Sequence, residues 1–209
     1  MSSASGTDSG ATPPADAGAY AASRQADLLR RAQQGDRSAF GHLVLACQDR
    51  LYNALLRMCN NPDDARELTQ ETFMRALQKL DTFRGDAQPY TWLFRIATNL
   101  VITEARKTTR RRTTSFDQAT GLAERLRSHD DSPAESAQRR QRNEQILAGL
   151  CRIDAEYRAI LVMRDVEDFD YQQMADILAL PLGTVKSRLF RARKALRDEL
   201  HELINQSER

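Results

Sequence analysis

The sequence has no long apolar run, and this absence excludes several classes of protein. No purely apolar stretch is longer than that from Ala159 to Met163, which Arg164 follows, whereas a helix needs ~20 such residues to span a bilayer. No apolar segment precedes the first positively charged side chain, Arg24, so we expect neither a secretory signal peptide nor membrane insertion. Nine glycines and six prolines in 209 residues exclude a collagen-like or Pro/Gly-rich low-complexity chain.

Cysteine and histidine are also scarce. The three cysteines, Cys47, Cys59 and Cys151, are widely spaced and form no CxxC pair, and the three histidines are scattered. This pattern predicts small buried thiols and no disulfide framework, metal site or cofactor. The 31 Lys and Arg nearly balance the 29 Asp and Glu, for a net charge of +2, so net charge implies no partner. We expect a soluble protein of the reducing cytoplasm.

Composition along the chain indicates an all-α fold of two small helical domains joined by a flexible linker. Of residues 1–25, 21 are Ala, Ser, Gly, Thr, Pro or Asp, which predicts a disordered tail. Large apolar residues at helical spacing mark residues 26–112 and 138–209, and the polar stretch 113–137 between them is the predicted linker. The expected helices are 36–59, 62–80, 89–107, 138–150, 154–165, 170–179 and 183–202.

The helix expected from Pro62 begins with a capping Asn61 and two carboxylates in its first turn. Ala65, Leu68, Phe73 and Leu77 fall on one half of it at 100° per residue. The other half is mostly acidic and amide and holds Asp64, Glu67, Gln70, Glu71, Met74 and Gln78. Such a face is usually a solvated surface, although an exposed Met also suits protein docking.

The helix expected from Pro89 carries a different surface. Trp92, Leu93 and Ile96 are predicted core. A separate stripe without any carboxylate comprises Thr91, Arg95, Thr98, Asn99, Ile102 and Arg106. It leads into residues 106–112, where five of seven residues are cations. A basic run alone is equally typical of a solvated linker, but together with the stripe it favours contact with nucleic acid.

Residues 170–202 have a helix-turn-helix layout. A short amphipathic helix, Asp170 to Leu178, is followed by a tight break at Ala179 to Gly183 and by a long helix from Thr184. Between Leu182 and Arg197 there are six cations and no acid. The residues predicted to dock inward are Val185, Leu189, Ala192, Leu196 and Leu200. Those predicted to project outward are Lys186, Ser187, Phe190, Arg191 and Lys194. Such a surface can read bases or grip phosphates.

Several of these segments resemble a known family. LTQETFMRAL (68–77), FRGD (83–86) and YTWLFRIATNL (90–100) are similar to region 2 of bacterial sigma factors. YQQMADILALPLGTVKSRLFRARKAL (171–196) is similar to region 4. With two domains and a short linker, the chain most resembles the extracytoplasmic-function (ECF) group of the sigma-70 family, and the resemblance covers Asp27 to about Leu203.

The resemblance implies a role for each surface. Docking on core RNA polymerase falls to Asp64, Glu67, Gln70, Glu71 and Met74. Recognition of the −10 element, including capture of a flipped base, falls to Phe83, Arg84, Gly85, Asp86, Arg95, Asn99, Arg106, Arg110 and Arg111. Recognition of the −35 element falls to Thr184, Lys186, Ser187, Arg188, Phe190, Arg191 and Lys194. Trp92 and Phe94 could serve as melting aromatics, but the place of Trp92 at the edge of the apolar face favours core.

The predicted function is that of an alternative sigma factor, which binds core polymerase and promoter DNA, promotes melting and needs no small-molecule substrate. Many members of the group are also held by an anti-sigma factor, so that partner is implied as well. The alternative is a stand-alone helix-turn-helix regulator, but the sequence shows no dimerisation heptads. HExxH, GxGxxG, P-loop and nucleophile-elbow motifs are absent, so we expect no enzyme. Glu167, Asp168 and Asp170 resemble part of a metal cluster, but without an EF-hand glycine we assign them to the start of the next helix.

Overall fold

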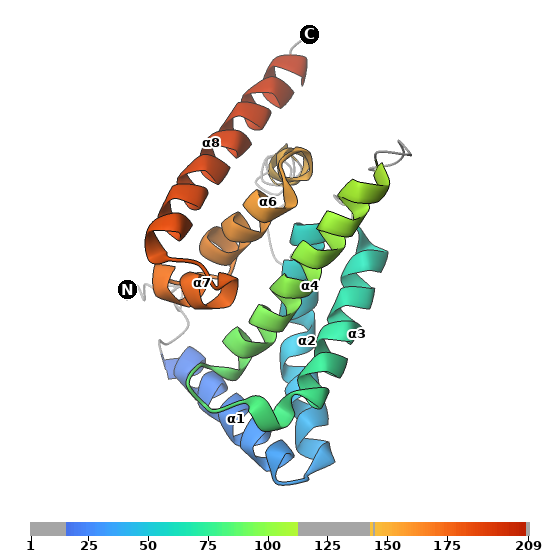
Figure 1. The fold of residues 1–209 in the computed structure, drawn as a ribbon, viewed down its shortest axis with the longest axis vertical. Coiled ribbons are helices and arrows are strands. Elements are labelled where there is room, and N and C mark those ends of the chain that lie inside the picture. Colours follow the sequence, from blue (N-terminus) through green and yellow to red (C-terminus); the bar gives the residue numbers. More distant parts are fainter. Residues whose placement is uncertain (1–15, 113–142, 144, 208–209) are drawn as a thin grey trace, which may run out of the picture.

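The computed structural model describes residues 16–112, 143 and 145–207, and every regular element in these ranges is helical (Figure 1). This confirms the predicted all-α class. Residues 145–152 form a helix that precedes α6. The other elements are α1 (Asp16–Gln33), α2 (Arg37–Cys59), α3 (Pro62–Gln78), η1 (Leu80–Thr82), α4 (Pro89–Arg112), α6 (Ala155–Leu161), η2 (Val162–Val166), α7 (Tyr171–Leu178) and α8 (Leu182–Ser207).

The predicted disordered tail is wrong at its C-terminal end, because α1 already begins at Asp16. Alanine has the highest helix propensity, and the second half of α1 is anchored in the core by Leu28 and Leu29. Residues 1–15 lie outside the described part of the chain, as do the predicted linker 113–137 and the start of the helix expected at 138–150. The helix expected over 89–107 is longer than predicted and continues to Arg112.

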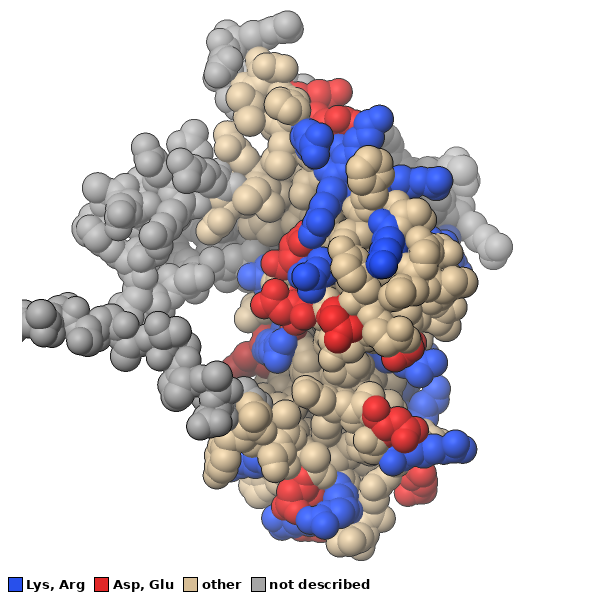
Figure 2. Space-filling model, turned by 90° about the vertical axis from the view of Figure 1, so that its left-hand side faces the viewer, with Lys and Arg blue, Asp and Glu red and all other residues tan. Residues whose placement is uncertain are grey.

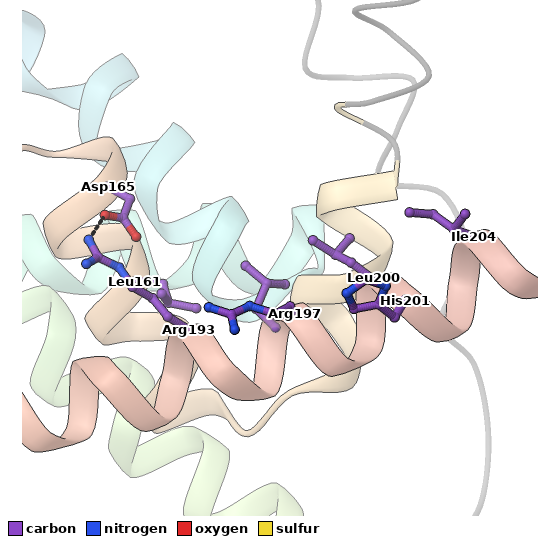
Figure 3. Close-up of a pocket in the computed structure, with 8 residues that line it drawn as sticks. Leu161, Asp165, Arg193, Arg197, Leu200, His201 and Ile204 are labelled. Carbon is purple, nitrogen blue, oxygen red and sulfur yellow. Dashed lines mark hydrogen bonds and ion pairs between the residues drawn. The ribbon is translucent and has the colours of Figure 1, made fainter.

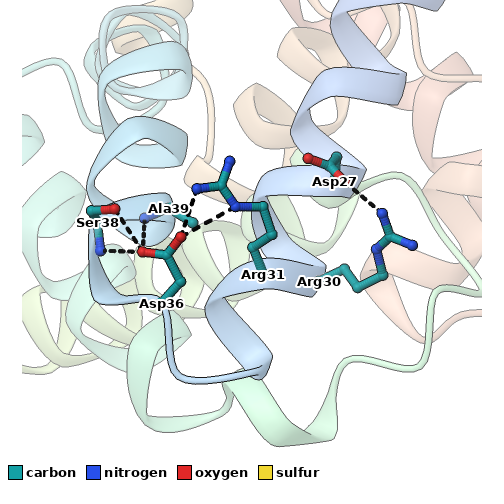
Figure 4. A network of polar contacts seen from close by, with 6 residues as sticks. All are labelled: Asp27, Arg30, Arg31, Asp36, Ser38 and Ala39. Carbon is teal, nitrogen blue, oxygen red and sulfur yellow. Dashed lines mark hydrogen bonds and ion pairs between the residues drawn. The ribbon is translucent and has the colours of Figure 1, made fainter.

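The corner between α1 and α2 is fixed by a capping carboxylate (Figure 4). Gly35 turns the chain with φ +97°, a conformation that glycine adopts without strain. Asp36 then caps α2: its side chain accepts from the backbone N–H groups of Ser38 and Ala39 at 3.0 and 3.2 Å. The hydroxyl of Ser38 and the guanidinium of Arg31 also donate to this carboxylate. These hydrogen bonds, that of Ser38 first, lower the pKa of Asp36 to about 2.

The helix-turn-helix begins after a short π-helical turn, η2. The backbone N–H groups of Glu167 and Phe169 close this turn on the carbonyls of Val162 and Met163, each at 3.0 Å. Asp168 lies between them with φ +56°. Asp170 caps α7 by accepting from the Gln173 N–H at 2.8 Å, and the Gln173 side chain accepts in return from the Asp170 N–H at 2.9 Å. Asp170 therefore starts the next helix, as the sequence indicated.

The two halves of the chain lie against each other along α2 and α4 on one side and α6, η2 and α7 on the other (Figure 1). The buried side chains of both halves form one continuous apolar cluster. None of the described helices combines the length and apolarity needed to cross a bilayer. We call residues 16–112 the first half and residues 145–207 the second half.

The three cysteines are free thiols. Cys47 is buried, as predicted, whereas Cys59 and Cys151 are only partly buried and donate to the carbonyls of Leu55 and Leu147 one helical turn earlier. Burial raises the pKa of Cys47 and of Cys59 to about 11 and also raises that of Cys151.

The capping box of α7 supplies a test of the fold. We expect Asp170→Ala to lower the free energy of unfolding by about 1 kcal/mol, because it leaves the backbone N–H of Gln173 without its side-chain acceptor. Asp154→Ala is the matched control, since Asp154 occupies the same position before α6 but forms no capping hydrogen bond. Urea denaturation of both variants measures the difference. Equal losses would contradict the assigned role of the cap.

Candidate nucleic-acid interface

The N-terminal part of α8 separates an inner apolar face from an outer polar one. Val185, Leu189 and Ala192 are buried on the side of α8 that packs against α6 and α7. The outer face holds Lys186, Ser187, Phe190, Arg191 and Lys194, all exposed. Phe190 is 72% exposed, which is unusual for an aromatic residue without a partner. The faces agree with those expected from the sequence, except that Leu196 and Leu200 are only partly buried.

Not every cation of α8 lies open to a ligand. Arg188 donates to Oε2 of Glu156 at 3.1 Å, and Arg193 donates to Asp165. The ammonium of Lys186 lies 5.7 Å from the centre of the Tyr171 ring. Among the described residues, no ion pair engages Arg191 or Lys194. Figure 2, which views the side where α8 lies, shows many Lys and Arg in the upper half, with some acidic residues among them and more below.

The stripe expected along α4 is only partly a surface. Arg95, Asn99 and Arg106 are exposed, as predicted. Thr91 and Thr98, however, are buried, at 8% and 0% exposure, so the prediction was wrong for them. The reason is that α4 is covered on two sides, by α2 and α3 and by α6 and α7. Arg110 and Arg111 lie in the last turn of α4, but their side chains are outside the described residues.

The loop before α4 presents the remaining predicted −10 residues. Arg84, Gly85 and Asp86 are exposed, and Gly85 has φ +84°. Phe83 is half-buried: its ring lies 5.3 Å from the Trp92 ring, and its carbonyl accepts from the Gln33 side chain at 2.8 Å. Trp92 itself is partly buried against the core, as its place on the helix indicated. The loop is therefore held at its start and open at its tip.

The acidic and amide face of α3 is exposed over Asp64, Glu67, Gln70 and Met74, and Met74 is 57% exposed. Glu71 is half-buried and pairs with Arg75 at 2.6 Å. Partial burial, followed by the charges of Glu67, Glu104 and Asp63, raises the pKa of Asp64.

Leu77, which the sequence assigned to the buried half of α3, is 52% exposed. Residues three apart on a helix are neighbours. The spacing of Met74 and Leu77 could therefore have predicted that the two form one exposed apolar pair.

A groove of about 610 Å³ joins the two predicted DNA-binding surfaces. Its walls include Ile102 and Arg106 of α4, and Arg188 and Arg191 of α8. At its floor Glu156 of α6 accepts from Arg106 on Oε1 at 2.8 Å and from Arg188 on Oε2 at 3.1 Å. No local pattern in the sequence predicted that Arg106 and Arg188 bind the same carboxylate, because the two arginines are 82 positions apart.

A smaller, mainly apolar hollow of about 310 Å³ lies between α6 and the C-terminal part of α8 (Figure 3). Leu161, Leu196, Leu200 and Ile204 line it. The Asp165–Arg193 ion pair lies at one end of this hollow (Figure 3). This hollow lies apart from the outer face of α8.

Known proteins match both halves. Residues 43–111 match the family "Sigma-70 region 2" and residues 143–196 match "Sigma-70, region 4". The chain is 30% identical to the RNA polymerase sigma-H factor of Pseudomonas aeruginosa, over 86% of this chain and 95% of the relative. It is 29% identical to the ECF RNA polymerase sigma factor SigW of Bacillus subtilis, over 84% and 96%.

Two solved structures share the fold. One is the sigma factor RpoE from Bartonella quintana in complex with the anti-sigma factor NepR, with a TM-score of 0.62 and 24% identity over 78% of this chain and 96% of that one. The other is CnrH in complex with the cytosolic domain of CnrY, with a TM-score of 0.59 and 24% identity over 87% and 98%. An all-helical chain with these two regions in this order is a bacterial transcription initiation factor of the sigma class. The protein belongs to the sigma-70 family, within its ECF group.

Proposed function

We propose that this protein is an alternative sigma factor that binds core RNA polymerase, recognises the −35 and −10 elements and promotes melting at the start site. The observation that carries the proposal is the presence of three separate surfaces on one chain: the outer face of α8, the loop and stripe of α4, and the exposed face of α3. The outer face of α8 lies in the segment that matches region 4, and the other two surfaces lie in the segment that matches region 2. The chemistry of RNA synthesis belongs to the polymerase, and the protein acts in the cytoplasm.

The outer face of α8 is the proposed reader of the −35 element. A helix of this kind places its N-terminal residues in the major groove. Lys186, Ser187 and Arg191 can donate to bases or phosphates, and the exposed Phe190 can contact a thymine methyl group. Thr184 and Lys194 flank this surface. Arg188 joins them once its bond with Glu156 is released.

The loop after η1 and the exposed part of α4 are the proposed reader of the −10 element. Extracting a base costs a few kcal/mol of stacking, which contacts in a pocket must offset. The loop tip, Arg84 to Asp86, lies open beside the anchored Phe83 ring. Asn99 and Arg95 supply the hydrogen-bond donors that single-stranded bases and phosphates require. Arg106 extends this basic surface toward the DNA backbone. We assign Arg110 and Arg111 to the same element from the sequence alone.

The exposed face of α3 is the proposed docking surface for core polymerase. Met74 and Leu77 offer adaptable apolar contact, surrounded by Glu67, Gln70 and Asp64. An exposed apolar pair with a polar rim is typical of a protein interface. We also propose an anti-sigma partner, as the family membership implies; the RpoE structure from Bartonella quintana holds such a partner.

Transcription with core polymerase tests the proposed function directly. Purified protein and core bacterial RNA polymerase, supplied with a fragment library from the source genome, are expected to initiate at discrete sites that share −35 and −10 elements. Core polymerase alone and core polymerase with its primary sigma factor are the controls. Binding to palindromic sites by the protein alone, without new initiation, would instead favour a stand-alone regulator.

The −35 assignment predicts the effect of one exposed arginine. We expect Arg191→Ala to weaken open-complex formation at these promoters by about 1–3 kcal/mol, because one base or phosphate contact is lost. Arg197→Ala is the control, since Arg197 lies on the same helix but lines the apolar hollow. Open-complex lifetimes in a filter-binding assay measure both. An open-complex lifetime unchanged by Arg191→Ala would contradict the assignment of α8 to the −35 element.

The docking assignment predicts a loss of holoenzyme. We expect Gln70→Ala combined with Glu71→Lys to reduce binding to core polymerase at least tenfold while the fold stays intact, because the Glu71–Arg75 pair is a surface ion pair of small energetic value. Gln34→Ala with Asp27→Lys is the matched control, since Asp27 also sits in a surface helical ion pair. Fluorescence titration with labelled core polymerase measures both. Normal assembly of the α3 variant would show that polymerase docks elsewhere.

A further inference from the structure

The side chain of Gln33, the last residue of α1, holds the start of the loop between η1 and α4. Its Nε2 donates to the carbonyl of Leu80 at 2.9 Å and to that of Phe83 at 2.8 Å. One amide group thus spends both of its N–H donors on backbone carbonyls 47 and 50 positions away. Gln33 is half-buried, so water competes less for these hydrogen bonds than it does at an exposed site.

The position of Gln33 is set by the packing of α1 and by the corner that follows it. Leu29 lies one turn earlier on the same face and is fully buried, which fixes the rotation of α1 about its axis. Beyond Gln33, Gly35 turns the chain, and Asp36 binds the guanidinium of Arg31 at 2.6 Å (Figure 4). The helix also packs against η1 and α4, and the loop between them passes beside it (Figure 1). The amide is therefore presented to the loop by a well-anchored helix end.

The loop has a fixed base and an open tip. At its start, the Leu80 carbonyl also accepts from the N–H of Phe83 at 3.2 Å, and the Phe83 ring lies 5.3 Å from that of Trp92. At its end, the Gln88 carbonyl accepts from the N–H of Trp92 at 3.0 Å as α4 begins. Residues 84–88 between these anchors are all exposed. Gln33 thus acts on the base of the loop, whereas the tip stays open to a ligand.

A loop that reads a base needs its donors and acceptors in place before the base arrives. A loose loop loses conformational entropy when it closes on a ligand, which lowers affinity. A loop that is free to shift can also adapt its contacts to a wrong base, so discrimination falls as well. Because Gln33 binds main-chain carbonyls, it fixes the backbone whatever side chains residues 84–88 carry.

We propose that Gln33 is a positioning residue for recognition of the −10 element, which acts by holding the base of the loop and does not itself touch DNA. The proposal rests on the proposed function for the role of the loop. It gives α1 a part in promoter selectivity, although none of the three proposed surfaces lies on α1. Loss of the contact is expected to change which −10 sequences are used and to leave the −35 preference unchanged, since α8 reads that element.

Fluorescence of the free protein gives the first test. Gln33→Leu keeps a similar size but has no donor, and Gln33→Glu brings a carboxylate against two carbonyl oxygens. The chain has a single tryptophan, Trp92, and its contact with Phe83 makes its emission a reporter of the loop base. We expect acrylamide to quench Trp92 more strongly in both variants than in the wild type, at unchanged helix content by circular dichroism.

Transcription by the holoenzyme gives the second test. Promoters randomised at the −10 element, and a second set randomised at the −35 element, are transcribed with core polymerase and each variant, and the transcripts are counted by sequencing. In Gln33→Leu and Gln33→Glu, the advantage of the best −10 sequence over its single-base variants is expected to fall about fivefold, the equilibrium effect of one net hydrogen bond. The ranking of −35 sequences is expected to match the wild type.

Two further variants separate positioning from other effects. Gln33→Lys is expected to restore the −10 preference, because its ammonium can donate to both carbonyls. Its added charge strengthens DNA binding equally for all sequences and leaves the ranking of bases unchanged. Gln34→Leu is the matched control: it makes the same change at the next position, which is exposed and bonds α1 through its backbone N–H. We expect it to behave as the wild type in both tests.

The proposal requires both changes. Initiation that falls by the same factor at every −10 sequence would show that Gln33 only stabilises the fold, and would overturn the positioning role. Quenching of Trp92 that is unchanged in both variants would overturn it as well, because the loop base would then not depend on Gln33. Absence of initiation by the wild type would overturn the proposed function, and the loop's role as a reader with it, whereas the quenching result would still decide whether Gln33 holds the loop.

Discussion

The arrangement of this sigma factor depends on the pairing of Glu167 across the two halves. A carboxylate at this depth is disfavoured unless it is paired and hydrogen-bonded, and both Arg50 and Tyr90 donate to this one. The π-helical turn before it and the left-handed Asp168 direct the carboxylate toward α2 and α4 and place Phe169 beside it. The groove lined by Glu156 and the covered side of α4 belong to the same contact between the halves.

Local signals in the sequence predicted the helices well. Asn61 before Pro62 marked the start of α3, and Asp170 marked the start of α7; both side chains cap their helices. The spacing of Val185, Leu189 and Ala192 predicted the inner face of α8. These signals are reliable because capping and amphipathic spacing act within one or two helical turns. The start of α1 was missed because Asp16 to Gln25 has the small residues of a disordered tail, and its helix depends on the anchor at Leu28 and Leu29.

The interface between the halves could not be predicted in this way. Arg50 and Glu167 are 117 positions apart, and Met58 and Arg158 are 100 apart. Neither residue of such a pair carries a local pattern that names the other, and Glu167 looked like part of an acidic cluster before a helix. Thr98 shows the same limit: its spacing in the sequence places it in the polar stripe of α4, but the packing of other helices on α4 buries it. The surfaces for polymerase and DNA were visible as faces of single helices, whereas their mutual arrangement was not.

The placement of the three thiols, one buried and two partly buried, affects how the protein reacts with oxidants. The thiolate is the form that peroxides attack, and a pKa of about 11 at Cys47 and Cys59 leaves roughly one molecule in ten thousand in that form at pH 7. Cys151 is shifted in the same direction. The sulfur atoms therefore serve as packing and hydrogen-bonding groups in helices, and we expect them to react slowly with peroxides.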